Sequence, residues 1–201
     1  MSSMPKKIIA VDVDDTLFDE NTAIRLFMNE KYGLNHTPED YDIVAPYEGY
    51  WENIWQLDPE EMNARYEAFV VSSHKANLDP FLNAIDVLRY LKQDYDLVVV
   101  TSRDHRTVDV THQSLAQHYP DIFHDVHFVP LWGNGEKVTK AKICNEIGAS
   151  YLIDDSYDHC RLATEAGVTA LLFGDYGRNR IQKLLPGMIR ALDWNEVKEY
   201  F

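Results

Sequence analysis

Short apolar runs rich in β-branched residues alternate with segments of helical spacing along most of this 201-residue chain. The runs that predict buried strands are 8–13, 97–101, 126–129, 151–153 and 169–173. The segments with helical spacing are 106–119, 138–148, 157–167 and 178–192. This alternation predicts an α/β fold, in which a Rossmann-like, mostly parallel sheet carries helices on both faces.

The alternation stops between the first and second predicted strands. From about residue 19 to residue 77 no segment reads as a buried strand, although a helix is expected over about 21–32. About 60 residues is too long for an ordinary connection between a strand and a helix. The pattern predicts a small helical cap domain, residues 19–78, inserted into a core formed by residues 1–18 and 79–201.

Composition excludes several classes of partner. A content of 45% hydrophobic and 26% charged residues is typical of a soluble globular protein, and the net charge of -14 argues against binding a nucleic-acid polymer or an anionic membrane. No run approaches the roughly 18 apolar residues of a membrane span. Cys144 and Cys160 fit neither a disulfide framework nor a zinc site. We therefore expect a cytoplasmic protein with reduced thiols, and we assign no oligomeric state.

The segment KIIAVDVDDTLF places Asp12 and Asp14 at the end of the first predicted strand. Residues two apart in an extended chain point the same way, so the two carboxylates are expected close together, which is costly unless a cation or a proton intervenes. An alternative interpretation is that Asp14, Asp15 and Thr16 form a capped turn and that Asp19 caps the following helix.

Polar residues also end two later strands. Thr101 and Ser102 follow the second strand, and Asp154 and Asp155 follow the run 151–153. Each of these signals is compatible with simple capping, but the carboxyl ends of parallel strands meet at one edge of a sheet, where ligands bind. A hydroxyl with nearby backbone N–H groups can hold a phosphate.

The chemistry of such a group favours phosphoryl transfer. Several carboxylates in one cavity suit Mg²⁺, which binds through a few carboxylates together with substrate phosphate. Lysine and threonine side chains supply donors for phosphate oxygens. One aspartate can then attack phosphorus, and a second can act as general acid and base.

Taken in order, these segments resemble the motifs of the haloacid dehalogenase (HAD) superfamily of phosphohydrolases. DVDDT resembles the first motif, VVVTS the second, a lysine before a helix the third, and LIDDS the acidic fourth. The resemblance implies that Asp12 is the nucleophile and Asp14 the general acid and base. It also implies that Thr101, with Ser102, binds the phosphate of a small phosphorylated substrate.

The same resemblance implies a Mg²⁺ site. Asp12, Asp154 and the main-chain carbonyl of Asp14 would bind the metal, and Asp155 would orient the metal or its waters. For the lysine of the third motif, Lys140 is favoured over Lys142, because it stands directly at the expected helix start.

The insert after the first motif resembles the cap that closes over the site in this superfamily and selects the substrate. Among capped members, the short chain and the TS pair are most similar to the 5'(3')-deoxyribonucleotidase branch and its uncharacterised bacterial relatives. Those nucleotidases tend to have proline after TS, whereas this chain has Arg103. We predict a Mg²⁺-dependent phosphatase, with a 5'-nucleotidase as the finer hypothesis.

Several residues keep two interpretations. The rings of Tyr47, Tyr50, Trp51 and Trp55 could stack on a base or sugar, or pack within the cap. The cations that follow two strands could grip a second anionic group or be solvated; they are Arg103, Arg106, Arg178 and Arg180. The eight histidines show no ligand spacing and are expected to be structural or exposed.

Two other classes of protein share part of this pattern. A receiver-type phosphoacceptor also clusters Asp, Thr or Ser, and Lys around Mg²⁺, but its acceptor aspartate would lie on a later strand and it has no room for the cap. A non-catalytic relative that binds a phosphorylated ligand or a protein is the other alternative; absence of turnover would be its sign.

Overall fold

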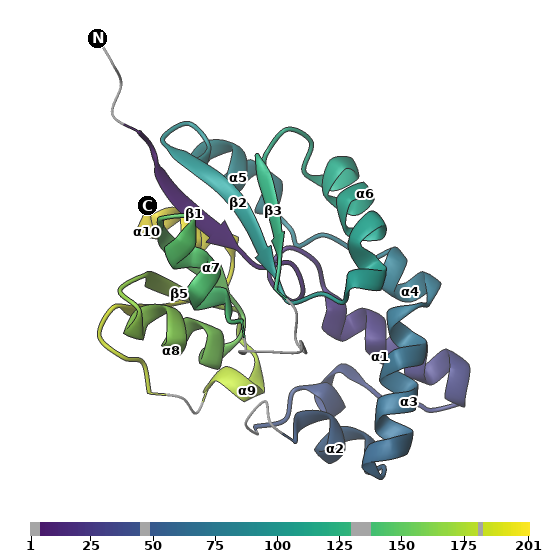
Figure 1. Ribbon diagram of the computed structural model, residues 1–201. Helices are drawn as coiled ribbons and strands as arrows, with labels where there is room; N and C mark the ends of the chain where they lie inside the picture. The colour runs from purple at the N-terminus through teal and green to yellow at the C-terminus, as the bar shows by residue number, and fades with distance from the viewer. Residues whose placement is uncertain (1–4, 45–48, 130–137, 181–182) are drawn as a thin grey trace.

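A computed structural model describes residues 5–44, 49–129, 138–180 and 183–201 of the protein. Its centre is a six-stranded sheet in the order β3-β2-β1-β4-β5-β6, with every neighbouring pair parallel (Figure 1). The strands are β1 (Lys7–Val11), β2 (Tyr95–Thr101), β3 (Asp125–Phe128), β4 (Ala149–Asp154), β5 (Thr169–Phe173) and β6 (Met188–Ala191). The predicted α/β fold is confirmed.

Helices cover both faces of the sheet because the apolar side chains of the central strands alternate between the faces. Ile9 and Val11 of β1 belong to a core shared with α5 (Ala84–Leu91) and α10 (Trp194–Tyr200). Ala10, between them, faces a second core shared with α7 (Lys140–Glu146) and α8 (Tyr157–Glu165). Another core helix, α6 (Val108–His118), follows the short η2 (His105–Thr107) after β2.

The C-terminal part of the sheet differs from the prediction of a helix over 178–192. Among the described residues of this range, only those of α9 (Gly177–Arg180) are helical, and β6 pairs with β5. Pro186 and Gly187 interrupt the helical spacing, because proline lacks the N–H that a helix requires and Gly187 has φ of 90°. The apolar residues after Gly187 then complete the edge of the sheet.

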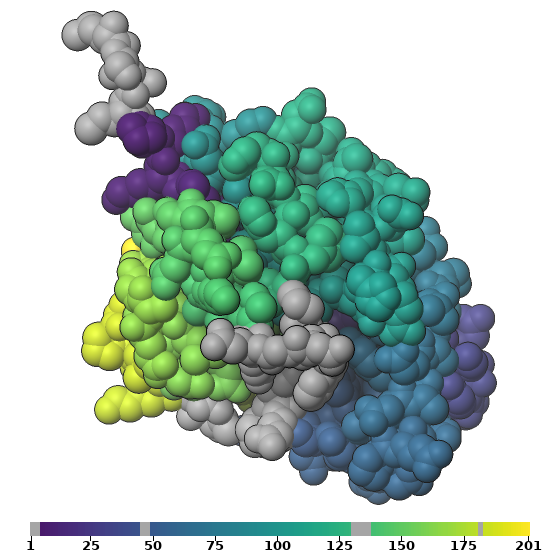
Figure 2. Space-filling model, viewed as in Figure 1, coloured from purple at the N-terminus to yellow at the C-terminus, as the bar shows by residue number. Residues whose placement is uncertain are grey.

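The segment between β1 and α5 forms the cap helices, which lie at the end of the sheet toward which the strands point (Figure 1). They are α1 (Glu20–Tyr32), η1 (Pro38–Tyr41), α2 (Tyr50–Trp55), α3 (Pro59–Val70) and α4 (Ser73–Ala76). In the space-filling view, their blue surface lies below the teal surface of the core (Figure 2). Among the described helices, none combines the length and apolarity needed to cross a bilayer.

Two chain segments connect the cap to the core, and they run beside each other. The Asp19 N–H donates to the Asp79 carbonyl at 2.9 Å, and the Phe81 N–H donates to the Leu17 carbonyl at 3.0 Å. The Asp19 side chain accepts from the Thr22 N–H at 2.9 Å and so caps α1. The capping interpretation of Asp19 is therefore confirmed.

Aromatic side chains form the inside of the cap. Tyr50 and Trp55 are buried, and the Trp51 and Trp55 rings stack with centroids 4.9 Å apart. The Trp55 indole N–H donates to the Tyr41 hydroxyl at 2.8 Å. These rings pack within the cap, in agreement with the packing interpretation, whereas Tyr47 lies outside the described residues.

The loop that follows β1 is held by side chains from distant parts of the core. The Tyr119 hydroxyl donates to the Leu17 carbonyl at 2.6 Å, and the Trp194 indole N–H donates to the Thr16 carbonyl at 3.0 Å. Both donors are buried. The backbone that carries the first acidic motif is therefore fixed by tertiary hydrogen bonds as well as by its own turn.

We expect Tyr119→Phe to lower the free energy of unfolding by about 0.5–1.5 kcal/mol, because it removes one buried hydrogen bond while keeping the ring. Urea unfolding measures this change. Tyr157→Phe is the matched control, since its hydroxyl also donates to a carbonyl, that of Lys183, but in an exposed position. Equal losses in the two variants would contradict the anchoring role of Tyr119.

Candidate active site

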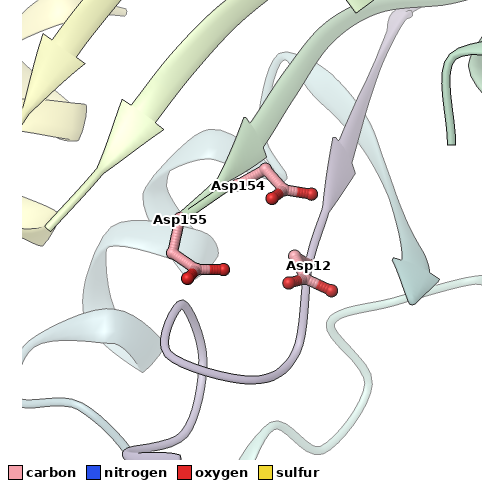
Figure 3. Close-up of side chains that lie close together, drawn as sticks. All are labelled: Asp12, Asp154 and Asp155. Atoms are coloured by element: carbon pink, nitrogen blue, oxygen red, sulfur yellow. The ribbon is translucent and has the colours of Figure 1, made fainter. Parts of the chain in front are cut away.

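Three carboxylates converge where β1 and β4 end. One oxygen from each of Asp12, Asp154 and Asp155 lies within 4.8 Å of the others, and all three residues are buried. Figure 3 shows the side chains pointing into one space, Asp12 from the end of β1 and the other two from the end of β4. The adjacent strands are joined there by the Asp12 N–H, which donates to the Ile153 carbonyl at 2.9 Å.

Lys140 brings a positive charge between two of these carboxylates. It is the first residue of α7, whose N-cap Thr139 accepts from the Lys142 N–H at 3.2 Å. The Lys140 Nζ lies 2.6 Å from Asp12 Oδ1 and 2.7 Å from Asp154 Oδ2, and its side chain is 1% exposed. Lys142 is exposed on the same helix.

Burial and neighbouring charges separate the pKa values of these groups. Burial raises the pKa of Asp12 well above its ordinary value; Asp154 and Asp155 add to the rise, and Lys140 offsets only part of it. Burial also acts to raise the pKa of Asp154, but Lys140 and His159 outweigh it and the pKa is lowered. The two carboxylates beside Lys140 thus differ in how readily they ionise.

Asp155 has a different cationic partner. Arg178, in α9, lies with its Nη2 2.6 Å from Asp155 Oδ2 and 2.8 Å from Asp15 Oδ2. Its guanidinium also packs 4.1 Å from the centre of the Tyr176 ring. Burial raises the pKa of Asp15 to about 8, with Arg178 opposing the rise. Neither of the two interpretations of Arg178, a grip on a substrate anion or a solvated charge, describes this buried ion pair.

Asp14 lies apart from the three-carboxylate group. Its carboxylate forms an ion pair with Arg103, whose Nη2 is 2.6 Å from Oδ1, and with Lys75, whose Nζ is 2.9 Å from the same oxygen. Burial acts to raise the pKa of Asp14, but the two cations outweigh it and hold the pKa below its ordinary value. Arg103 is thus occupied by Asp14 and is neither solvated nor open to a second substrate anion.

The other predicted residues are placed as follows. Thr101 is buried at the end of β2, where its hydroxyl accepts from the Arg103 N–H at 3.2 Å, and Ser102 is half-buried in the next position. Arg106 and Arg180 are exposed and form surface ion pairs. The hydroxyl of Thr101 therefore stands at the same sheet edge as the acids, as predicted.

Two contributors were not found from the sequence, Lys75 and His159, whereas Arg178 was named there with two interpretations. Lys75 lies in a four-residue cap helix. His159 was assigned with the other histidines to structural or surface roles, yet its Nδ1 lies 3.3 Å from Asp154 Oδ1. No spacing rule marks these contacts, because each depends on how a helix packs.

The charge balance of the described residues fits a divalent cation. Around this edge, the carboxylates of Asp12, Asp15, Asp154 and Asp155 are paired with two cations, Lys140 and Arg178. When all four carboxylates are ionised, as they would be around a bound cation, four negative charges against the two positive charges leave an excess of two. Oxygen ligands and an excess of two negative charges are what Mg²⁺ requires in a protein.

The sheet, the cap helices after its first strand and the acidic group at its edge form the HAD-like fold that the sequence motifs predicted. Over residues 6–201 the chain matches the family described as 5' nucleotidase, deoxy (pyrimidine), cytosolic type C protein (NT5C). The chain belongs to this family. The resemblance drawn from its motifs is therefore confirmed.

Two bacterial relatives match the chain over nearly its full length. A Staphylococcus epidermidis protein, provisionally named a 5'(3')-deoxyribonucleotidase, is 23% identical over 203 residues, covering 98% of this chain and 97% of the relative. The Bacillus subtilis protein YqfW, provisionally named a nucleotidase, is 22% identical over 200 residues, covering 96% and 92% of the two chains.

Solved structures share the fold. A haloacid dehalogenase-like hydrolase from Streptococcus pneumoniae superposes with a TM-score of 0.67 at 18% identity, over 97% of this chain and 98% of the other. YfnB from Bacillus subtilis, provisionally assigned as a HAD hydrolase and solved bound to magnesium, gives a TM-score of 0.62 at 16% identity, over 98% and 99%.

We expect Lys140→Met to destabilise the protein by about 3–5 kcal/mol in EDTA, because it leaves two buried carboxylates without their cation. Adding Mg²⁺ should stabilise this variant more than the wild type. Thermal unfolding with and without the metal measures both effects. Lys142→Met, on the exposed face of the same helix, is the control and should change little; equal effects in both variants would contradict the assignment of Lys140.

Without divalent metal, the free energy of unfolding should fall as pH rises from about 5 to about 8. The pKa values of Asp12, Asp15 and Asp155 are raised, that of Asp15 to about 8, so the folded state binds more protons than the unfolded chain in this window. Asp14 and Asp154, whose pKa values are lowered, are ionised in both states there and add no slope.

Urea unfolding in EDTA at a series of pH values measures that slope. Asp15→Asn should make it shallower, because the amide does not titrate. Asp86→Asn, at an exposed position of α5, is the control and should leave it unchanged. A stability that rises with pH over this window would contradict the expected proton binding.

Proposed function

We propose that this protein is a Mg²⁺-dependent phosphatase that hydrolyses a small phosphomonoester through an aspartyl-phosphate on Asp12. The observation that carries the proposal is the buried group of Asp12, Asp154 and Asp155 with the Lys140 ammonium seated between the first two. Such a group holds a nucleophile, a metal site and a fixed positive charge in one place.

The residues that would hold Mg²⁺ are Asp12, Asp154 and the main-chain carbonyl of Asp14, with Asp155 orienting the metal or its waters. When bound, the metal neutralises negative charge on the phosphoryl group and brings it within reach of the nucleophile. Arg178 forms ion pairs with both Asp155 and Asp15. Because Arg178 already neutralises the charge of Asp155, Asp155 is a weaker candidate for a metal ligand than Asp154.

In the first step, a carboxylate oxygen of Asp12 attacks phosphorus and the bond to the leaving oxygen breaks. Asp14, which is ionised before the ester binds, takes the proton of the monoanionic phosphate group and passes it to that oxygen, so that an alcohol departs. Lys140 balances charge beside Asp12, and Thr101 with Ser102 binds the phosphoryl oxygens. In the second step, water attacks phosphorus, Asp14 takes its proton, and the bond to Asp12 breaks to release inorganic phosphate.

The substrate we propose is a nucleoside monophosphate, which makes the protein a 5'-nucleotidase. Membership of the nucleotidase family supports this choice, and the net charge of -14 argues against a nucleic-acid polymer. Residues 19–78 would act as the cap domain that selects the leaving group. Because Tyr50 and Trp55 are buried inside that cap, the base would contact other cap residues. The cytosolic description of the family supports a cytoplasmic location.

Phosphate release from nucleoside monophosphates, sugar phosphates and other small phosphomonoesters, with Mg²⁺ or with EDTA, tests the proposal. We expect wild-type turnover to need Mg²⁺ and Asp12→Asn to lose at least about three orders of magnitude, because the nucleophile is removed. Beryllium fluoride should bind the wild type and not Asp12→Asn.

Asp79→Asn is a control with the same chemical change on the cap connection, and it should keep its activity. Normal turnover by Asp12→Asn would overturn the assignment of the nucleophile. If the wild type releases no phosphate from any ester of the panel, the non-catalytic, ligand-binding alternative is favoured. A preference for deoxynucleotides would support the deoxyribonucleotidase branch.

A further inference from the structure

A second ionic cluster lies beside the first, and the proposed reaction uses only one of its members, Asp14. It joins Asp14 of the loop after β1, Glu20 at the start of α1, Lys75 of α4 and Arg103 of the loop after β2. Two carboxylates and two cations make it neutral in charge. It therefore has no electrostatic need for a metal, unlike the neighbouring group.

The two cations are buried and are themselves held in place. The side chains of Lys75 and Arg103 are 4% and 1% exposed, whereas that of Asp14 is 19% exposed. Lys75 also pairs with Glu20, and Arg103 Nη1 donates to the Thr111 hydroxyl at 3.0 Å. Within this cluster the two carboxylates are thus the partly exposed members, Asp14 at 19% and Glu20 at 14%, and the two cations are buried.

The two oxygens of Asp14 are held unequally. Oδ1 lies 2.6 Å from Arg103 Nη2, 3.1 Å from Arg103 Nε and 2.9 Å from Lys75 Nζ. Among the described residues, Oδ2 receives one hydrogen bond, from Arg103 Nε at 3.0 Å. One oxygen is thus saturated with donors, while the other keeps accepting capacity.

We propose that Lys75 and Arg103 are positioning residues that clamp Asp14 Oδ1 from two sides and leave Oδ2 as the oxygen available to the reacting atoms. This inference rests on the proposed function, because it assumes that Asp14 exchanges protons with the leaving group and with water. Lys75 comes from the cap and Arg103 from the core, so the clamp couples the orientation of Asp14 to the docking of the cap. The charge-assisted, bidentate contact from Arg103 supplies the stronger geometric constraint.

Leaving groups that differ in their need for a proton separate this role from a general structural one. Thymidine 5'-monophosphate releases an alkoxide that must be protonated, whereas p-nitrophenyl phosphate releases a stable phenolate. If nucleotides are not turned over, glycerol 2-phosphate replaces the first ester. Rapid-quench measurement of the first turnover reports the step that forms the phosphoenzyme.

In Lys75→Met and Arg103→Met, we expect the first turnover of the alkyl ester to slow by about 10²-fold, within the range typical of general acid catalysis. The burst of p-nitrophenolate should change less than about threefold. Steady-state turnover of both esters should fall, because Asp14 must also activate water in the second step. Asp14→Asn should show the same pattern with a larger loss.

Lys75→Met leaves the Glu20 carboxylate unpaired, so loss of stability needs a separate control. In the double variant Glu20→Gln/Lys75→Met the cluster keeps the charge pair of Asp14 with Arg103, and stability should recover while the slow first turnover of the alkyl ester remains. Arg106→Met removes a different contact between core and cap, the pair with Glu67, and should retain both rates.

The outcomes distinguish this inference from the proposed function. If the wild type releases no phosphate from either kind of ester, the proposed function fails and this inference falls with it. If the wild type is active but the clamp variants lose both first turnovers equally, or lose neither, the positioning role is wrong while the phosphatase assignment stands. Recovery of the alkyl-ester rate in the double variant would likewise overturn it.

Discussion

Mutual repulsion among buried carboxylates is the constraint on which the rest of this structure depends. Parallel pairing of β1 with β4 brings Asp12, Asp154 and Asp155 to one point, where burial makes their charge expensive. Two helices supply cations that offset this charge, α7 through Lys140 and α9 through Arg178. The start of α7 and the position of α9 after β5 are thus part of the same electrostatic arrangement, and the remaining negative charge favours a divalent cation.

The two ionic clusters differ in net charge, and this difference suits them to different parts of the proposed reaction. The cluster around Asp12 carries excess negative charge and suits a metal with its phosphoryl ligand, whereas the cluster around Asp14 is neutral and suits a side chain that must keep a fixed orientation. Asp12 and Asp14 are only two residues apart, yet the turn between β1 and α1 sends their carboxylates to different partners. Under the proposed function, this separation would place the nucleophile in one cluster and the proton carrier in the other.

The cap contributes Lys75 to the cluster around Asp14 from a position close to its connection with the core. Lys75 lies a few residues before the second connection, which is tied to the first by the hydrogen bond from Asp19 to Asp79. Lys75 thus lies where the cap meets the core, which suits its contact with Asp14, while substrate selection would fall to cap residues farther from the connections.

The sequence by itself determined the class of fold and the acidic edge of the sheet, because alternating apolar runs impose a parallel sheet and parallel strands end on one side. Asp12, Asp154 and Asp155 were found from this rule, and Lys140 from its place at a helix start. Strand β6 was missed because pairing with β5, and not local spacing, decides the conformation of 188–191. The roles of Lys75, Arg103 and Arg178 were decided only by tertiary structure, since an ion pair between residues far apart in the chain depends on where helices dock, and no local pattern encodes that position.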